Sequence, residues 1–306
     1  MKRMLAAIAL LGLGFLPGDE PKMFTDWSPP ENLGPTVNSP YLDSCVSISK
    51  NGLTLIFSST RQSPGTTNRD LYVSKRESKS DPWGPPAPIT MLNTADWESC
   101  PALSLDEHRL YFTSPRAGGC GGQDIWVSRR QDRRDDFGWE PPVNLGCASD
   151  GYVNTSAGEL TPTFFEDERG NVVLYFSSNR PGSAGWDHYQ SVMRDDGTFG
   201  PATPITELNS SYADQGITVR RDGLEVFFLS NRSGAHMLPD FWRATRRSTE
   251  DPWSEPEYVS SLNPANAQGR IALSFDGLEI YFTSWNQPSY GAPDLWVARR
   301  EIIRGR

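Results

Sequence analysis

One sequence unit recurs five times along the chain, and it constrains the fold more than any other feature. Each copy carries an aromatic run followed by an Asp-aliphatic-aromatic run. The aromatic runs begin at Ile56, Tyr111, Tyr175, Phe227 and Tyr281, and the second runs begin at Asp70, Asp124, Asp187, Asp240 and Asp294. A bulky aromatic residue opens each unit, at Trp27, Trp83, Trp139, Phe199 and Trp253. A period of about 55 residues is typical of a repeat architecture, in which each unit buries its apolar faces against its neighbours.

Within a unit the pattern predicts four short strands. The innermost is a run such as 46–49, closed in three copies by Asn-Gly or Asp-Gly, which favour tight hairpins. The aromatic run, the Asp run and the segment after the opening aromatic residue follow as the second, third and outer strands. The sequence therefore predicts an all-β fold: a five-bladed β-propeller of four-stranded antiparallel blades over residues 24–306.

The chain ends predict how the ring closes. The first unit begins with an outer-type strand at 27–33, whereas the last unit ends on its third strand at 294–300. The N-terminal strand should therefore complete the last blade, because that pairing satisfies two exposed strand edges at once.

Three motifs carry a resemblance to a known family. These are Ser274-Phe275-Asp276-Gly277, the Tyr-Phe-Ser-Ser-Asn-Arg run at 175–180, and the Asp-Ile-Trp-Val-Ser-Arg run at 124–129. They resemble the repeats of TolB-type, WD40-like β-propellers over about residues 27–301. The resemblance implies the fold and leaves the function open, because that family serves binding, scaffolding and enzymatic roles.

The N-terminal segment and the cysteines both point to export. Residues 1–23 combine a basic start with a short apolar run, which predicts a signal peptide or an uncleaved anchor, and a periplasmic or extracellular protein. The even number of four cysteines is consistent with disulfides. Cys120 and Cys147 are expected to bridge between neighbouring loops, whereas Cys45 and Cys100, at equivalent positions of adjacent blades, are expected to lie too far apart to bridge without distortion.

The charge excludes some partners. A formal net charge of −9 repels nucleic acid and anionic membranes, so membrane contact is expected only through an uncleaved N-terminal segment. Neither metal-ligand spacing nor a cofactor motif is present in the sequence, so no metal and no cofactor is expected. The paired basic residues that end the third strands, such as Arg299-Arg300, are expected on a solvated surface.

An acidic residue recurs at the start of the innermost strands. The ring comprises Asp43, Glu98, Glu159 and Asp214, with Gln268 in the fifth unit; an arginine follows the aromatic run at Arg61, Arg116, Arg180 and Arg232, with Asn286 in the fifth. The carboxylates could form a metal-binding or acid–base cluster at the channel mouth. Alternatively, each carboxylate pairs with the arginine of its own blade. The loss of both charges together in the fifth unit favours the second interpretation.

Residues that break the repeat are the better candidates for a ligand site. Arg270 replaces a small residue and could clamp a carboxylate, sulfate or phosphate group, or else neutralise the acidic ring. Aromatic residues expected on the same face could stack on sugars or simply pack loops; they are Tyr41, Trp97, Trp186, Tyr212 and Trp285. With Gln268 and Asn286, these residues form the candidate ligand-binding set.

Two functions remain from the sequence. The favoured one is an exported binding or scaffold protein that holds a small polar ligand, a glycan or a protein partner on its loop-rich face, and is not an enzyme. It is favoured because no nucleophile–base motif is present in the sequence. The alternative is a glycoside hydrolase or lyase that uses two of the central carboxylates as acid and base or nucleophile.

Overall fold

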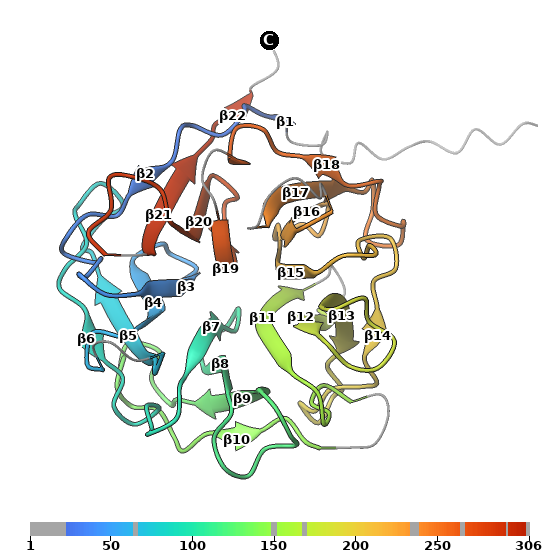
Figure 1. Ribbon diagram of the computed structural model, residues 1–306, viewed down its shortest axis with the longest axis horizontal. Helices are drawn as coiled ribbons and strands as arrows, with labels where there is room; N and C mark the ends of the chain where they lie inside the picture. Colours follow the sequence, from blue (N-terminus) through green and yellow to red (C-terminus); the bar gives the residue numbers. More distant parts are fainter. Residues whose placement is uncertain are drawn as a thin grey trace, which may run out of the picture.

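Five four-stranded antiparallel sheets surround a central axis in the computed structural model of the chain (Figure 1). The structure describes residues 23–303 except 64–66, 148–151, 167–169, 233–238, 264–266 and 292. The predicted five-bladed propeller is confirmed. The segment expected to be a signal peptide or anchor lies almost wholly outside the described residues.

From the axis outward the strands follow chain order in every blade but the last, whose outer strand comes from the N-terminal part of the chain. The innermost strands are β3 (Asp43–Ile48), β7 (Ser99–Leu103), β11 (Glu159–Glu166), β15 (Asp214–Val219) and β19 (Ala267–Leu273). The second strands are β4 (Thr54–Ser59), β8 (Arg109–Ser114), β12 (Val172–Ser178), β16 (Glu225–Ser230) and β20 (Glu279–Ser284). The third strands are β5 (Asp70–Lys75), β9 (Asp124–Arg129), β13 (Asp187–Val192), β17 (Asp240–Thr245) and β21 (Asp294–Arg299). The outer strands are β6 (Ala87–Pro88), β10 (Val143–Asn144), β14 (Thr203–Pro204), β18 (Glu257–Tyr258) and β2 (Glu31–Asn32).

This order gives the ring two different faces. The connections from second to third strands, and those from each outer strand to the next blade, lie on one side, which we call the loop face. The turns that join innermost to second strands, such as the one closed by the Gly52 N to Ser49 O bond, lie on the other side, the hairpin face.

The N-terminal strand closes the ring, as predicted. β2 completes the blade of β19, β20 and β21, with Glu31 opposite Val297 and Asn32 opposite Trp296. A further strand pair ties the two chain ends together, because β1 (Met23–Phe24) pairs with β22 (Ile302–Ile303). The last blade is therefore built from both ends of the chain (Figure 1).

The hydrophobic core consists of five clusters, one between each pair of neighbouring blades. The aromatic residue that opens each unit is buried in one of these clusters, in the order Trp27, Trp83, Trp139, Phe199 and Trp253. The expectation that the paired basic residues are solvated holds for only one member of the last pair. Arg299 is exposed, whereas Arg300 is buried with its guanidinium 4.4 Å from the Trp27 ring. The Arg300 guanidinium therefore packs against the aromatic core, although the sequence pattern predicted that it would be exposed to solvent.

Two disulfides are present. Cys120 and Cys147 are bonded, which links the blade of β7–β10 to the connection that follows it. Cys45 and Cys100 are also bonded, so the expectation that they lie too far apart was wrong. Both residues adopt positive φ, of 50° and 51°, in a bulge of an innermost strand. Neighbouring innermost strands converge there, and the two Cα atoms are 4.5 Å apart.

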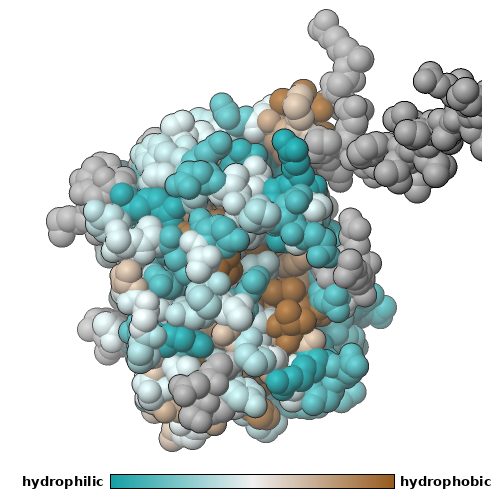
Figure 2. Space-filling model, turned by 90° about the vertical axis from the view of Figure 1, so that its right-hand side faces the viewer, coloured by the Kyte–Doolittle hydropathy of each residue, from teal (hydrophilic) through white to brown (hydrophobic). Residues whose placement is uncertain are grey.

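The flank formed by the blades of β11–β14 and β15–β18 is mostly hydrophilic, with apolar surface in small separate patches (Figure 2). Within the described part of the chain, no helix is long and apolar enough to cross a bilayer. The strands of each blade are joined on the loop face and the hairpin face, and functional residues are most often carried by loops on a rigid scaffold.

One core position departs from the repeat. His188 in β13 occupies the place of Leu71, Ile125, Phe241 and Leu295 in the other blades. It is fully buried against Phe228, and neither ring nitrogen has a hydrogen-bond partner among the described residues. Burial lowers the pKa of His188 to about 4, so the side chain is neutral in the folded protein.

Replacing His188 with leucine is expected to stabilise the protein by about 1–3 kcal/mol at pH 7, because two unsatisfied buried polar atoms are removed. The folded-state pKa lies below the unfolded value, so the wild type loses stability as the pH falls from about 6.5 to about 4. Thermal melts should therefore separate His188→Leu from the wild type more widely at pH 5 than at pH 7.5. A gap that is constant with pH would contradict a neutral, buried histidine.

Candidate functional site

The acidic ring lies at the loop-face ends of four innermost strands, where every carboxylate is paired with an arginine of its own blade. The N–O distances are 2.6 Å for Arg61–Asp43, 2.8 Å for Arg116–Glu98, 3.3 Å for Arg180–Glu159 and 2.8 Å for Arg232–Asp214. All four carboxylate side chains are fully buried. Asp43 also accepts hydrogen bonds from the backbone N and the hydroxyl of Ser39, at 2.5 and 2.7 Å.

The arginine partners are held as firmly as the carboxylates. Arg61 donates to the backbone carbonyl of Val37 at 2.7 Å and lies 4.8 Å from the ring of Tyr72. Arg116 repeats the arrangement with the carbonyl of Leu92. A carboxylate whose oxygens are occupied in this way is not available to exchange a proton with a substrate. The acidic ring therefore fixes the connections between blades.

The fifth blade departs from this arrangement by one residue. Ala267 pairs with Ser284 as Asp43 pairs with Ser59, so Ala267, and not Gln268, is the counterpart of the acidic ring. The side chain of Gln268 lies outside the described residues. The bulge that follows spans three residues, 269–271, where the other blades have two. This additional residue is what brings Arg270 to the axis.

Arg270 lies on the axis and binds backbone instead of the acidic ring. It is 5% exposed, and its Nη1 donates to the carbonyls of Val46 and Pro101 at 2.6 and 2.7 Å. Its Nε donates to the carbonyl of Pro162 at 3.0 Å. Burial lowers the pKa of Arg270 to about 9. The expectation that Arg270 clamps a ligand at the loop-face mouth, or neutralises the acidic ring there, does not fit this position.

Aromatic side chains cover part of the loop face, and we call them the aromatic surface. Tyr41, Tyr212 and Trp285 are 39%, 47% and 41% exposed, while Trp97 and Trp186 are half-buried. Tyr290, in the same connection as Trp285, is 49% exposed. Asn286 is half-buried there, and its backbone N donates to the hydroxyl of Ser284. Unlike the acidic ring, this surface is open to a ligand.

Carboxyl groups with raised pKa values begin three of the third strands, directly under the loop face. Burial raises the pKa of Asp70, Asp124 and Asp187, with the charge of Glu98 adding to the effect at Asp70. Asp187 follows Trp186 of the aromatic surface, and its Oδ1 has no hydrogen-bond partner among the described residues. The repeat hid these groups, because an aspartate at the same place in all five blades looks structural. Among the described residues, no group of three or more His, Cys, Asp or Glu side chains is placed to hold a metal ion.

Comparisons with known proteins define the fold type more closely. No family model matches the chain, and no curated protein matches it. Among solved structures, the catalytic domain of a family 62 α-L-arabinofuranosidase from Coprinopsis cinerea superimposes with a TM-score of 0.60 and 13% identity, over 90% of this chain and 96% of that one. An endo-arabinase from Bacteroides thetaiotaomicron gives 0.58 and 17% over 92% and 100%. A family 117 glycoside hydrolase from Zobellia galactanivorans gives 0.54 and 11% over 91% and 90%.

These neighbours overturn two predictions made from the sequence. The resemblance to TolB-type, WD40-like repeats was wrong, because the similar structures are glycoside hydrolase propellers. The interpretation of the chain as a binding or scaffold protein is corrected by the same comparison, which favours the glycoside hydrolase alternative. The motifs misled because their residues, such as Phe176 and Trp126, are buried blade-packing residues. Packing of this kind is common to propellers of different families.

Proposed function

We propose that this protein is an exported glycoside hydrolase that binds its glycan on the aromatic surface. The observation that carries the proposal is the superposition of nine-tenths of the chain on glycoside hydrolase propellers. These neighbours include an arabinofuranosidase, an endo-arabinase and a xylanase, so arabinan and xylan fragments are the first substrates to test. The two disulfides support an oxidising, extracytoplasmic location.

The aromatic surface suits a glycan for a physical reason. One face of a pyranose or furanose ring carries mainly C–H groups, and it packs well on a flat side chain such as Trp285. Tyr41 and Tyr212 add a hydroxyl to a flat ring, so each can hold an apolar sugar face and a sugar hydroxyl at once. Trp97, Trp186 and Asn286 line the same surface and belong to the proposed substrate contacts.

Hydrolysis requires a proton donor and a second carboxylate, which either attacks the sugar as a nucleophile or activates a water molecule as a base. We assign the donor to Asp187, because burial raises the pKa of its carboxyl group above the ordinary value and the residue adjoins Trp186. The buried, ion-paired acidic ring is not used for this step.

An assay of arabino- and xylo-oligosaccharide hydrolysis, in which the release of reducing sugar is measured, tests the proposal. Asp187→Asn is expected to lower kcat by about 10²–10⁴, the usual contribution of a general acid. Asp240→Asn, at the equivalent position of the next blade, is the control, because it removes the same repeated carboxyl group. Equal losses in the two variants would mean that the aspartate only supports the loop. If the wild type hydrolysed none of these oligosaccharides, the proposal that the protein is a glycoside hydrolase would be refuted.

Trp285→Ala separates binding from chemistry. Loss of the exposed ring is expected to raise KM by about tenfold with little change in kcat, because uniform substrate binding is removed. Tyr258→Ala, which removes a ring that is 47% exposed on the outer strand β18, should leave KM unchanged. A KM that is insensitive to Trp285→Ala would place the glycan elsewhere.

A further inference from the structure

The central axis opens on the hairpin face into a well of about 90 Å³. Residues from the ends of all five innermost strands, or from the turns after them, line the well. Its volume is sufficient for several water molecules or for one small polyatomic ion. The well faces away from the aromatic surface, so it is separate from the proposed glycan site.

The well is positively charged in an otherwise acidic protein. Lys50, Arg221 and Arg270 line it, and none of the described residues that line it is Asp or Glu. The chain as a whole carries a formal net charge of −9. A concave site lined by one sign of charge concentrates counter-ions of the opposite sign.

Arg270 provides the inner end of the well, and its hydrogen bonding is incomplete. Its Nε and Nη1 donate to backbone carbonyls, but the contact from Nη2 is with Thr163 Oγ1 at 3.4 Å. A guanidinium has five N–H donors, so Nη2 retains capacity for a ligand. Among the described residues no carboxylate is within ion-pair distance of Arg270, and a buried charge without a counter-charge is costly. A bound anion would supply that counter-charge.

Hydroxyl groups line the well together with the guanidinium. Ser47 Oγ accepts from Leu103 N at 3.3 Å, and Thr218 Oγ1 accepts from Leu273 N at 3.4 Å. Each of these oxygens acts as an acceptor in its bond, as Thr163 Oγ1 does toward Arg270. Each hydroxyl therefore keeps its own hydrogen to donate. A set of donors is what an oxyanion requires.

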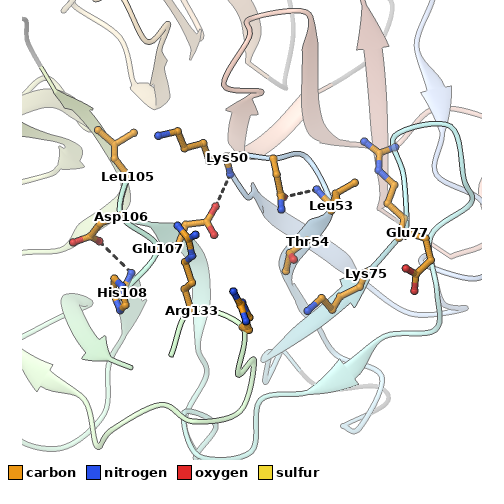
Figure 3. A pocket seen from close by; sticks show the side chains of 13 residues that line it. Lys50, Leu53, Thr54, Lys75, Glu77, Leu105, Asp106, Glu107, His108 and Arg133 are labelled. Atoms are coloured by element: carbon orange, nitrogen blue, oxygen red, sulfur yellow. Dashed lines mark hydrogen bonds between the residues drawn. The ribbon is translucent and has the colours of Figure 1, made fainter. Parts of the chain in front are cut away.

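The mouth of the well carries the two other cations on one aromatic platform. Lys50 Nζ is 4.7 Å from the centre of the Phe275 ring, and the Arg221 guanidinium is 4.2 Å from it. Figure 3 shows Lys50 extending its side chain toward Leu105. Lys50 also lines a groove of about 1000 Å³ between the first two blades. The other Lys and Arg residues of this groove are Lys75, Arg76, Arg133 and Arg134, and its acidic residues are Glu77, Asp106 and Glu107. Because basic side chains outnumber acidic ones in the groove, an anion has an approach of net positive charge from the rim to the axis.

We propose that the axial well binds one oxyanion of the sulfate or phosphate class, held by Arg270 and the hydroxyls of Ser47, Thr163 and Thr218, with Lys50 and Arg221 at the entrance. The ligand is either the free ion or a charged group carried on a glycan that lies in the groove.

Titration calorimetry of the full chain with sodium sulfate, at low ionic strength in chloride, tests the proposal. Saturable binding of one ion per chain is expected, and Arg221→Gln should weaken it by about tenfold or more, as expected for the loss of one charge-assisted contact. Arg247→Gln is the matched control, because it removes the same charge from an exposed arginine outside the well. Absence of saturable binding, or equal weakening in both variants, would overturn the site.

Two further measurements locate the ion and identify its source. An anomalous peak from selenate soaked into crystals is expected inside the well, next to Arg270, and a peak found solely elsewhere would overturn the assignment. Titrations with inorganic phosphate and with glucose 6-sulfate compare the sources. Equal or weaker binding of the sugar sulfate than of the free ions supports a free-ion site, and tighter binding supports a charged glycan in the groove.

Discussion

A variant that lacks residues 24–34 is expected to lose its cooperative thermal transition. The deletion removes β2 and half of β1, and with them the outer strand of the last blade. It also removes Trp27, whose loss alone is expected to cost about 3–5 kcal/mol. Arg300, which lies 3.9 Å from the Phe24 ring and 4.4 Å from the Trp27 ring, would be left without either partner. Together these losses approach the whole stability of a typical domain, about 5–15 kcal/mol.

Differential scanning calorimetry and circular dichroism measure this effect. A variant that lacks residues 1–22 is the control, because it leaves both N-terminal strands in place. An equal melting temperature for the 24–34 deletion and the control would show that the ring does not depend on the N-terminal strand for closure.

Glu225→Gln is expected to cost about 3–5 kcal/mol, because it removes a buried negative charge that three arginines share. Glu225 is fully buried, and Arg300, Arg220 and Arg243 approach it at 2.6, 2.7 and 2.6 Å. Arg300 comes from the neighbouring blade, so the carboxylate also joins two blades.

The dependence of the free energy of unfolding on pH, in the acidic range, provides a second test. Burial alone would raise the pKa of Glu225, but the hydrogen bond and charge of Arg300, with the charges of Arg220 and Arg243, lower it below its ordinary value. A lowered folded-state pKa means that the carboxylate stabilises the fold above the unfolded-state pKa, near 4.3, and loses this effect as the pH falls through the folded value. The difference between wild type and Glu225→Gln should therefore narrow below about pH 4.

Glu257→Gln is the matched control for this substitution. Glu257 also pairs with Arg243, but at 3.6 Å and with its side chain 73% exposed. An exposed pair contributes about 0–1 kcal/mol, so urea unfolding should hardly detect its loss. Comparable losses from the two substitutions would mean that burial does not govern the energetics of these ion pairs.

The fold was accessible from the sequence because the blade-forming residues repeat. Aromatic runs such as 56–59 supply the inter-blade core, and the unmatched outer strand at 27–33 revealed the closure. The pairing of each acidic residue with the arginine of its own blade could also be predicted, because both residues are absent from the fifth unit. In each case the information was local or periodic, and one repeat could be compared with four others.

The candidate site was harder to predict from the sequence than the fold, because its residues depart from the sequence repeat. The repeat spacing places Gln268 at the ring position of the fifth unit, but the fifth blade has a longer bulge, and only strand pairing reveals that Ala267 takes this position. The same bulge carries Arg270 from the expected mouth to the axis. Cys45 and Cys100 were misjudged because their separation depends on the positive φ of the bulge. The resemblance to TolB-type, WD40-like repeats was wrong because packing motifs are shared by propellers of different families.

The bonds of Arg270 also bear on how many blades the ring can hold. One guanidinium reaches from the fifth blade to carbonyls of the first, second and third, and its span is fixed by covalent geometry. Insertion of a sixth copy of the unit would widen the central channel beyond that span, and the buried guanidinium would lose some of its carbonyl partners. The reach of Arg270 thus limits the ring to five blades. A related propeller could gain or lose a blade only if this residue changed as well.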